Sequence, residues 1–227
     1  NEFRIDESEA DAIVFHFRDV NKKMPLPKTR PPGQIYVSFL KEAPPHAGSA
    51  SKTQPVSDFS LLLLFSPVQQ DEFDSMFENK RNMIMTMISN CGAESGRMNY
   101  IKELNKHIEI TKIGACYKKK ASKEEAKNLM KSHFFIIAFE NIHCTDYITE
   151  KFSRLTEGIV PIVLRRNNTR KKAPDSAFIA ADDFSSPKEL ADYLHEVAAD
   201  KKLYRKFFEW RNTHYIHNVD GFCDLCR

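Results

Sequence analysis

Residues 134–151 read FFIIAFENIHCTDYITEK, and this stretch decides the class of fold. Its first six residues form a short apolar run that is typical of a buried β-strand. The polar residues that follow lead into a helical pattern that begins at about Tyr147. Because buried strands that alternate with helices build layered α/β proteins, we expect a parallel sheet covered by helices.

The same alternation continues on both sides of this stretch. The expected strands lie at 84–89, 108–113 and 159–164, and the expected helices at 95–107, 122–131, from 186 onward and at 201–211. Ser186 can cap its helix, Pro187 fits the first turn and Glu189 completes a capping box. The aromatic residues of the last helix are expected to pack in the core.

Two more apolar runs, at 12–17 and 34–40, predict strands of a separate first unit. A proline-rich loop separates them. We therefore expect two domains, one over residues 1–78 and a second over residues 79–227 that ends in helices and a CxxC tail.

The composition is that of an ordinary globular protein, with 41% hydrophobic and 29% charged residues among 227. The 34 basic and 31 acidic residues leave a net charge of +3, which implies no nucleic-acid or membrane-surface partner. The longest apolar run, FSLLLLF at 59–65, is far shorter than the roughly 20 residues that a membrane helix needs. No charged leader precedes an apolar stretch at Asn1, so we expect this segment to be soluble.

The densest polar cluster runs from Glu140 to Lys151. It lies between a strand and a helix, where open α/β sheets bind ligands and where a helix N-terminus attracts anions. A lysine in a first helical turn opposes the helix dipole, so Lys151 is better explained by a bound phosphate. Glu150 could accept hydrogen bonds from sugar hydroxyls. The alternative is a helix cap followed by a surface ion pair.

Two weaker signals lie upstream. The sequence CGAESGR at 91–97 occupies a second strand-to-helix junction, and its glycines allow a ligand to approach the backbone. It lacks the spacing of a dinucleotide fingerprint or a P-loop. Glu42, in the proline-flanked sequence KEAPPH at 41–46, could act as a general base or be an ordinary solvated loop residue.

The cysteines indicate the compartment. Cys223 and Cys226 form a CxxC, which is typical of metal, redox or disulfide chemistry, and no second ligand pair suits zinc. A disulfide is favoured, which indicates an oxidising compartment. The glycosylation sequon at Asn167, followed by Asn168 and Thr169, points the same way.

The motif FENIHCTDYITEK at 139–151 resembles the FEN…DYxTEK signature of the α1,3-fucosyltransferases, glycosyltransferase family 10. Other segments follow in the family's order: RPPGQ at 30–34, EAPPH at 42–46, IVPIVL at 159–164, AFIAADDF at 177–184, SPKELADYL at 186–194 and FFEWR at 207–211. Together they cover most of the chain. Three segments depart from the family: the segments at 58–68 and 151–161 are shorter than usual, and RRNN at 165–168 replaces the usual LGPxR.

The resemblance implies two Rossmann-like domains that face each other across a cleft, the GT-B type of fold. It implies transfer of L-fucose from GDP-fucose, with inversion and without a metal or cofactor, to an N-acetylglucosamine of an N-glycan or lactosamine-type glycan. The matching positions give Glu42 as general base and, for the donor, Arg97, Glu140, Asn141, Tyr147, Glu150 and Lys151. The family also implies a Golgi lumenal region behind an N-terminal membrane anchor absent from this segment.

Three further expectations concern cysteines, metals and rival functions. Cys91 and Cys116 flank a βαβ unit and, with support from the resemblance, are expected to form a disulfide. Asp182 and Asp183 could suggest a metal pair, but a turn before the next helix explains them more simply. The rivals are a transferase that uses another sugar nucleotide and a glycan-binding module without turnover.

Overall fold

The computed structural model describes residues 12–16, 32, 35–39, 68–143, 148–169 and 173–212. The chain divides into two compact units between Phe59 and Ser60. In the first unit, β1 (Ala12–His16) and β2 (Ile35–Phe39) pair in parallel. Both strands lie where the apolar runs predicted them.

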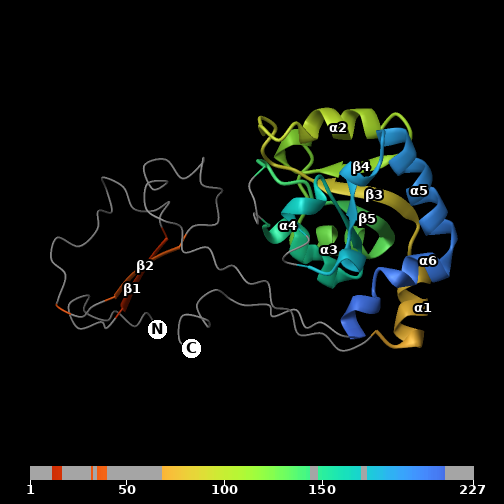
Figure 1. The fold of residues 1–227 in the computed structure, drawn as a ribbon, viewed down its shortest axis with the longest axis horizontal. Coiled ribbons are helices and arrows are strands. Elements are labelled where there is room, and N and C mark those ends of the chain that lie inside the picture. The colour runs from red at the N-terminus through yellow and green to blue at the C-terminus, as the bar shows by residue number, and fades with distance from the viewer. Residues whose placement is uncertain are drawn as a thin grey trace. The chain divides into compact units, whose positions relative to one another are not determined.

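The second unit contains a parallel sheet of five strands in the order β4-β3-β5-β6-β7 (Figure 1). The strands are β3 (Asn82–Met87), β4 (Ile110–Ile113), β5 (His133–Ile137), β6 (Val160–Val163) and β7 (Ile179–Ala180). In β5, Phe135 and Ile137 point to one face and Ile136 to the other, and all three are buried. Both faces of the sheet are therefore covered, as parallel sheets require.

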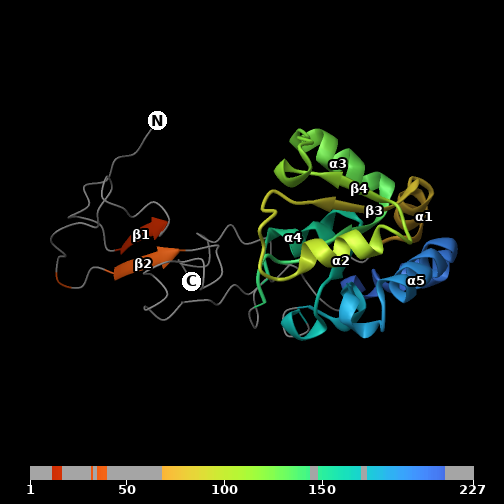
Figure 2. The same cartoon turned by 90° about the horizontal axis from the view of Figure 1, so that it is seen from above.

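The helices form two layers around this sheet. They are α1 (Gln70–Glu78), α2 (Arg97–Leu104), α3 (Lys123–Ser132), α4 (Glu150–Ser153), α5 (Pro187–Ala199) and α6 (Lys201–Lys206). Apolar residues of α1, α2, α5 and α6 share one core cluster, whereas α3 and α4 pack on the opposite face. Figure 2 shows α3 on one side of the strands and α2 and α5 on the other. The expected α/β class is confirmed.

Helix α1 belongs to the second unit, so the boundary lies earlier than the one expected after residue 78. The ring of Phe73 packs 6.3 Å from that of Tyr204 and 5.7 Å from that of Phe208, measured between centroids. Tyr204 is fully buried and donates its hydroxyl to the Phe134 carbonyl at 2.9 Å. These contacts confirm that the aromatic residues of the last helix build the core.

The helix ends show which signals were accurate. Ser186 caps α5 by accepting from Glu189 N at 3.2 Å, but the Glu189 carboxylate accepts from Ser185 N instead of completing the capping box. Helix α4 begins at Glu150, later than the position near Tyr147, and continues as a 3₁₀ turn over Arg154–Glu157. No helix within the described ranges is long and apolar enough to span a bilayer.

Candidate functional site

The strand order places a topological switch point between β3 and β5. The chain leaves β3 for β4 on one side, then returns across β3 to reach β5 on the other. In such sheets the connections diverge at the carboxyl ends of the two strands and leave a crevice for ligands. The loops that follow β3 and β5 carry the two polar clusters at 91–97 and 140–151, so the fold brings these signals together.

Hydrogen bonds tie these two loops to each other. Ser95 N donates to the Asn141 carbonyl at 3.2 Å, and Ser95 Oγ donates to the Glu140 carbonyl at 2.8 Å. His143 Nε2 lies 2.9 Å from the Ser95 carbonyl. The two strand ends therefore present one joined surface.

Arg97 braces the same junction from the inside. Arg97 is only 2% exposed. Its guanidinium donates to the Phe139 carbonyl at 2.8 Å and to the Asn90 carbonyl at 2.7 Å. Gly96, just before α2, has a φ of +71°, a backbone conformation that residues other than glycine rarely adopt. The arginine thus holds backbone carbonyls of both loops, and its expected contact with phosphate stays a prediction.

Glu140 and Lys151 form the charged centre of the site. Lys151 Nζ lies 3.0 Å from Glu140 Oε2, and the two side chains are 17% and 13% exposed, respectively. Glu140 Oε1 also accepts from Thr149 N and Thr149 Oγ1, both at 2.8 Å. The Glu140 carboxylate is directed at the start of α4, where it binds the residues on either side of Glu150.

Glu150 occupies the open side of this cluster. Its side chain is 63% exposed, and Lys151 Nζ lies 3.3 Å from its Oε1. Burial acts to raise the pKa of the Glu150 carboxyl, but the Lys151 charge and the hydrogen bonds around it hold that pKa below its ordinary value. Glu150 is therefore an ionised acceptor that faces solvent, as a sugar-binding carboxylate requires.

Asn141 contributes a buried side-chain oxygen to the site. Its side-chain Oδ1 is buried and has no hydrogen-bond partner among the described residues. Buried polar atoms in folded proteins nearly always have a partner in protein, water or ligand. This oxygen sits at the switch point, beside the loop contacts of Ser95.

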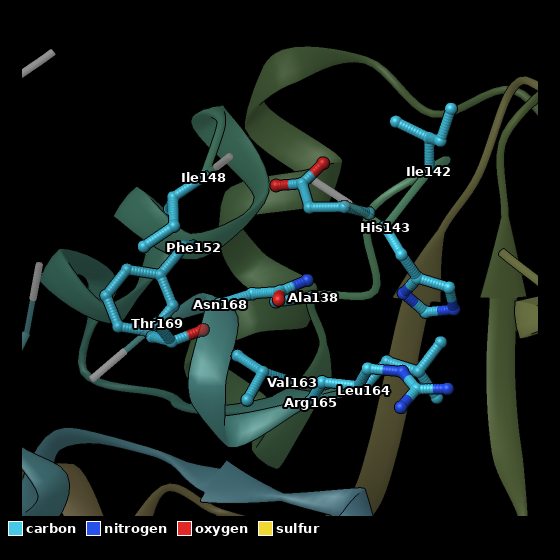
Figure 3. Close-up of a pocket in the computed structure, with 11 residues that line it drawn as sticks. Ala138, Ile142, His143, Ile148, Phe152, Val163, Leu164, Arg165, Asn168 and Thr169 are labelled. Atoms are coloured by element: carbon cyan, nitrogen blue, oxygen red, sulfur yellow. The ribbon is translucent and has the colours of Figure 1, made fainter. Parts of the chain in front are cut away.

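A small pocket opens between the carboxyl ends of β5 and β6 (Figure 3). Phe152, Val163 and Leu164 are among its apolar lining residues. His143 and Arg165 lie on one side of it and Thr169 on the other. The pocket combines an apolar surface with polar and basic groups.

An ion-pair network fixes the loop that carries Arg165. The next residue, Arg166, pairs with Asp175 at 2.7 Å and donates from Nε to Asp183 Oδ1 at 2.9 Å, while its guanidinium lies 5.0 Å from the centre of the Phe178 ring. The hydrogen bond to Asp183 is the main cause that raises the pKa of Arg166. Asp182 accepts from Arg166 N at 2.8 Å.

This network accounts for Asp182 and Asp183 as structural partners of Arg166 in the turn Ala181–Asp183. Within the described part of the chain, no three histidine, cysteine or acidic side chains are grouped to hold a metal ion.

The expected disulfide between Cys91 and Cys116 is confirmed, with 5.2 Å between the Cα atoms. It joins the loop after β3 to the turn after β4. Asn167 is exposed in the 3₁₀ turn Arg166–Asn168. The residues Glu42, Cys144, Tyr147, Cys223 and Cys226 lie outside the described residues.

Two polar residues that matter to the site were not singled out from the sequence. Ser95 joins the two loops, and Thr149 links Glu140 to Lys151. Thr149 immediately precedes α4, so its position as an N-cap residue was a usable signal. Ser95 gave no comparable signal, because its partners are two backbone carbonyls and the His143 imidazole, all distant in sequence.

The second unit is thus a doubly wound α/β domain with charged and polar side chains at the carboxyl ends of β3 and β5. Its sequence matches the model of the glycosyltransferase family 10 (fucosyltransferase) C-terminal region over residues 77–227, and residues 2–87 match the fucosyltransferase N-terminal model. The chain belongs to glycosyltransferase family 10, which confirms the resemblance carried by the FEN…DYxTEK motif.

Several curated proteins are similar to this chain. It is 40% identical over 168 residues to glycoprotein 3-alpha-L-fucosyltransferase A of Drosophila melanogaster, covering 70% of this chain and 33% of that protein. It is 32% identical over 225 residues to 4-galactosyl-N-acetylglucosaminide 3-alpha-L-fucosyltransferase 9 of Bos taurus, covering 92% of this chain and 63% of that protein. The chain therefore spans only part of the length of these relatives.

Solved structures support the fold. A crystal structure of an alpha1,3-fucosyltransferase with GDP-fucose superposes with a TM-score of 0.52 at 22% identity, over 63% of this chain and 42% of that chain. A structure with GDP gives a TM-score of 0.53, also at 22% identity, over 66% of this chain and 43% of that chain. The facing of two domains across a cleft stays a prediction.

Proposed function

We propose that this chain is part of an α1,3-fucosyltransferase that transfers L-fucose from GDP-fucose to an N-acetylglucosamine of a glycan. The observation that carries the proposal is the arrangement of Glu140, Glu150 and Lys151 at the switch point of the sheet in a chain of family 10. The related proteins named as α1,3-fucosyltransferases, and the similar structures with GDP-fucose and GDP, support the choice of donor.

In the proposed reaction, the acceptor hydroxyl attacks the anomeric carbon of fucose as the bond to the diphosphate breaks. Glu42 takes the proton of the hydroxyl, and the electron pair of the broken bond leaves with GDP from the opposite face. The anomeric configuration is therefore inverted. Lys151 supplies the positive charge that neutralises the leaving diphosphate, so the proposal requires no metal or cofactor. Glu150 accepts hydrogen bonds from the sugar.

The names of the relatives supply two candidate acceptors. One is named for a glycoprotein acceptor and the other for a 4-galactosyl-N-acetylglucosaminide. We propose an N-acetylglucosamine acceptor in either an N-glycan core or a lactosamine-type unit. Offering both glycans with GDP-fucose, in buffer that contains EDTA, tests donor, acceptor and metal independence together. GDP binding without transfer to either glycan would indicate a glycan-binding module without turnover.

The proposed location is the Golgi lumen, behind an N-terminal anchor. The disulfide Cys91–Cys116 and the exposed sequon at Asn167 support an oxidising, glycosylating compartment. Cys223 and Cys226 are proposed to be oxidised as well. Their partners are either each other or cysteines that precede Asn1 in the full protein. Peptide mapping of secreted protein under non-reducing conditions tests these assignments, and free thiols at Cys223 and Cys226 would contradict the second.

The proposed base is tested by Glu42→Gln, which keeps the size of the side chain and removes its basicity. Transfer is expected to fall by about 10²- to 10⁴-fold, because a positioned proton acceptor is lost, while GDP binding stays near the wild-type value. Initial rates with a fixed glycan acceptor measure the first quantity and calorimetry the second. A variant that transfers at the normal rate would exclude Glu42 and make His46 the next candidate.

A further inference from the structure

Three oxygens surround the ammonium group of Lys151, two in hydrogen bonds and one in an ion pair. Thr149 Oγ1 lies 2.8 Å from Nζ, Glu140 Oε2 lies at 3.0 Å and Glu150 Oε1 at 3.3 Å. Thr149 also donates its own hydroxyl proton to Glu140, at 2.8 Å to Oε1. Lysine, threonine and glutamate thus form a closed triangle, with Glu150 attached from outside.

Glu140 and Lys151 are much less exposed than Glu150. Glu140 is 13% exposed and is bound through both oxygens, including the contact from Thr149 N at 2.8 Å. A carboxylate this far from water is destabilising without partners, and removing one member of such a pair leaves the other uncompensated. Glu150 is 63% exposed and makes the longest of the three contacts, so water or a ligand can replace it at little cost.

We propose that Glu140 is a positioning residue that, together with the Thr149 hydroxyl, holds the Lys151 ammonium where the diphosphate of the sugar nucleotide leaves. The inference rests on the proposed function and assigns Glu140 no contact with the donor. When the donor binds, the phosphate takes the place of the Glu150 carboxylate on Lys151. The Glu150 carboxylate then accepts hydrogen bonds from sugar hydroxyls. The replacement of Glu150 by phosphate on Lys151 therefore allows both the phosphate contact of Lys151 and the sugar contact of Glu150.

A double-mutant cycle tests whether Glu140 acts through Lys151. Glu140→Gln keeps the shape but puts a neutral amide against the ammonium. It is expected to lower kcat at saturating GDP-fucose by roughly 10- to 100-fold, as expected for a displaced charge. In a Lys151→Met background the same change is expected to cost less than about 3-fold, since no ammonium remains to be positioned. Equal losses in both backgrounds would overturn the proposal.

Binding of GDP and guanosine gives a readout that a general folding defect would not produce. Glu140→Gln is expected to weaken GDP binding and to leave guanosine binding unchanged, because guanosine lacks the phosphates that Lys151 would meet. Equal weakening of both ligands would assign Glu140 to structure alone. If Glu140→Gln does not fold, Thr149→Val replaces it, since it removes the hydroxyl in the triangle and keeps the ion pair.

The matched control is Asp192→Asn, a carboxylate-to-amide change in the exposed ion pair with Lys188 on α5. It is expected to leave both ligands and kcat unchanged. Wild-type protein that neither binds GDP nor transfers fucose would refute the proposed function. Wild-type protein that does both, with an additive cycle, would refute only the role of Glu140.

Discussion

Two lysines at opposite ends of the same sheet differ in the groups that surround their ammonium ions. Lys80 precedes β3, is 5% exposed and donates to the carbonyls of Gly158 at 2.7 Å and Met130 at 3.3 Å. Lys151 follows β5 and lies among the carboxylates of Glu140 and Glu150. The carbonyls bind Lys80 without neutralising its charge, whereas the carboxylates around Lys151 do neutralise it.

This difference separates a structural cation, Lys80, from Lys151, the cation for which we propose a function. Burial lowers the pKa of Lys80 to about 7, so the folded protein tolerates its neutral form. Lys151 lies against two carboxylates, and one of them is exposed and replaceable. A lysine at the carboxyl edge of a parallel sheet therefore points to an anionic ligand when its partners are acidic and one of them faces solvent.

The largest effect is expected from removing the functional cation. Lys151→Ala is expected to lower transfer by about 10²- to 10³-fold, the range for losing one group that stabilises developing negative charge. GDP binding should weaken by about 10- to 100-fold, because a charge-assisted contact is lost. Calorimetry with GDP measures binding. Wild-type affinity for GDP in this variant would contradict the proposal that Lys151, unlike Lys80, contacts the diphosphate.

The disulfide tests whether the carboxyl edge depends on covalent support. The double variant Cys91→Ser, Cys116→Ser is expected to lose about 2–4 kcal/mol of unfolding free energy, since the crosslink restricts the unfolded chain. Denaturant unfolding measures this loss. An unchanged midpoint would indicate that the loop contacts of Ser95 and Arg97 support the edge alone.

Lys80, the structural lysine, is expected to make the free energy of unfolding depend on pH. Its folded pKa of about 7 lies below the ordinary value of 10.5, so between these values the unfolded state binds more protons. The free energy of unfolding should therefore rise with pH, by at most about 1.4 kcal/mol per pH unit, and Lys80→Met should abolish that rise. The test is the difference between wild type and variant from pH 7 to 9.

His133 does not interfere in this window, because burial lowers its pKa below the ordinary 6.5. Parallel pH profiles for wild type and Lys80→Met would show that Lys80 stays charged. Lys80→Met should also leave kcat per folded molecule unchanged, since the residue lies at the end of the sheet away from the site.

The smallest effect is expected at the surface. Asp192→Asn removes a partner of Lys188 when both side chains are more than 60% exposed. Exposed helix pairs of this kind contribute about 0.3–0.5 kcal/mol, so thermal unfolding should shift by a degree or two at most. A larger shift would mean that exposed ion pairs matter here more than their burial suggests.

The sequence was most informative where a pattern is local. The apolar runs of β3, β5 and β6 and the cap at Ser186 were readable because each depends on neighbouring residues. The two polar clusters were also readable, since both follow buried strands. Their meeting at a switch point follows from the strand order, which the alternating pattern alone does not specify.

What the sequence did not reveal depends on distant partners. Residues 70–78 were placed in the first domain and no helix was predicted there, because the packing of α1 against Tyr204 and Phe208 crosses most of the chain. The contacts of Arg97 with the carbonyls of Asn90 and Phe139 join residues of different loops, so no local pattern predicted them. The contacts of Glu140 with Thr149 and Lys151 cross a loop in the same way, and the expected donor contacts of Arg97 and Glu140 stay predictions.

The loop after β3 is fastened on both sides, by the disulfide to the turn after β4 and by Ser95 and Arg97 to the loop after β5. A loop held in this way has already lost most of its conformational freedom when the protein folds. A ligand that binds there gives up little further entropy in ordering the backbone, so more of the contact energy remains as affinity. Donor binding at this edge is therefore expected to be fast and limited by encounter rather than by rearrangement of the loop.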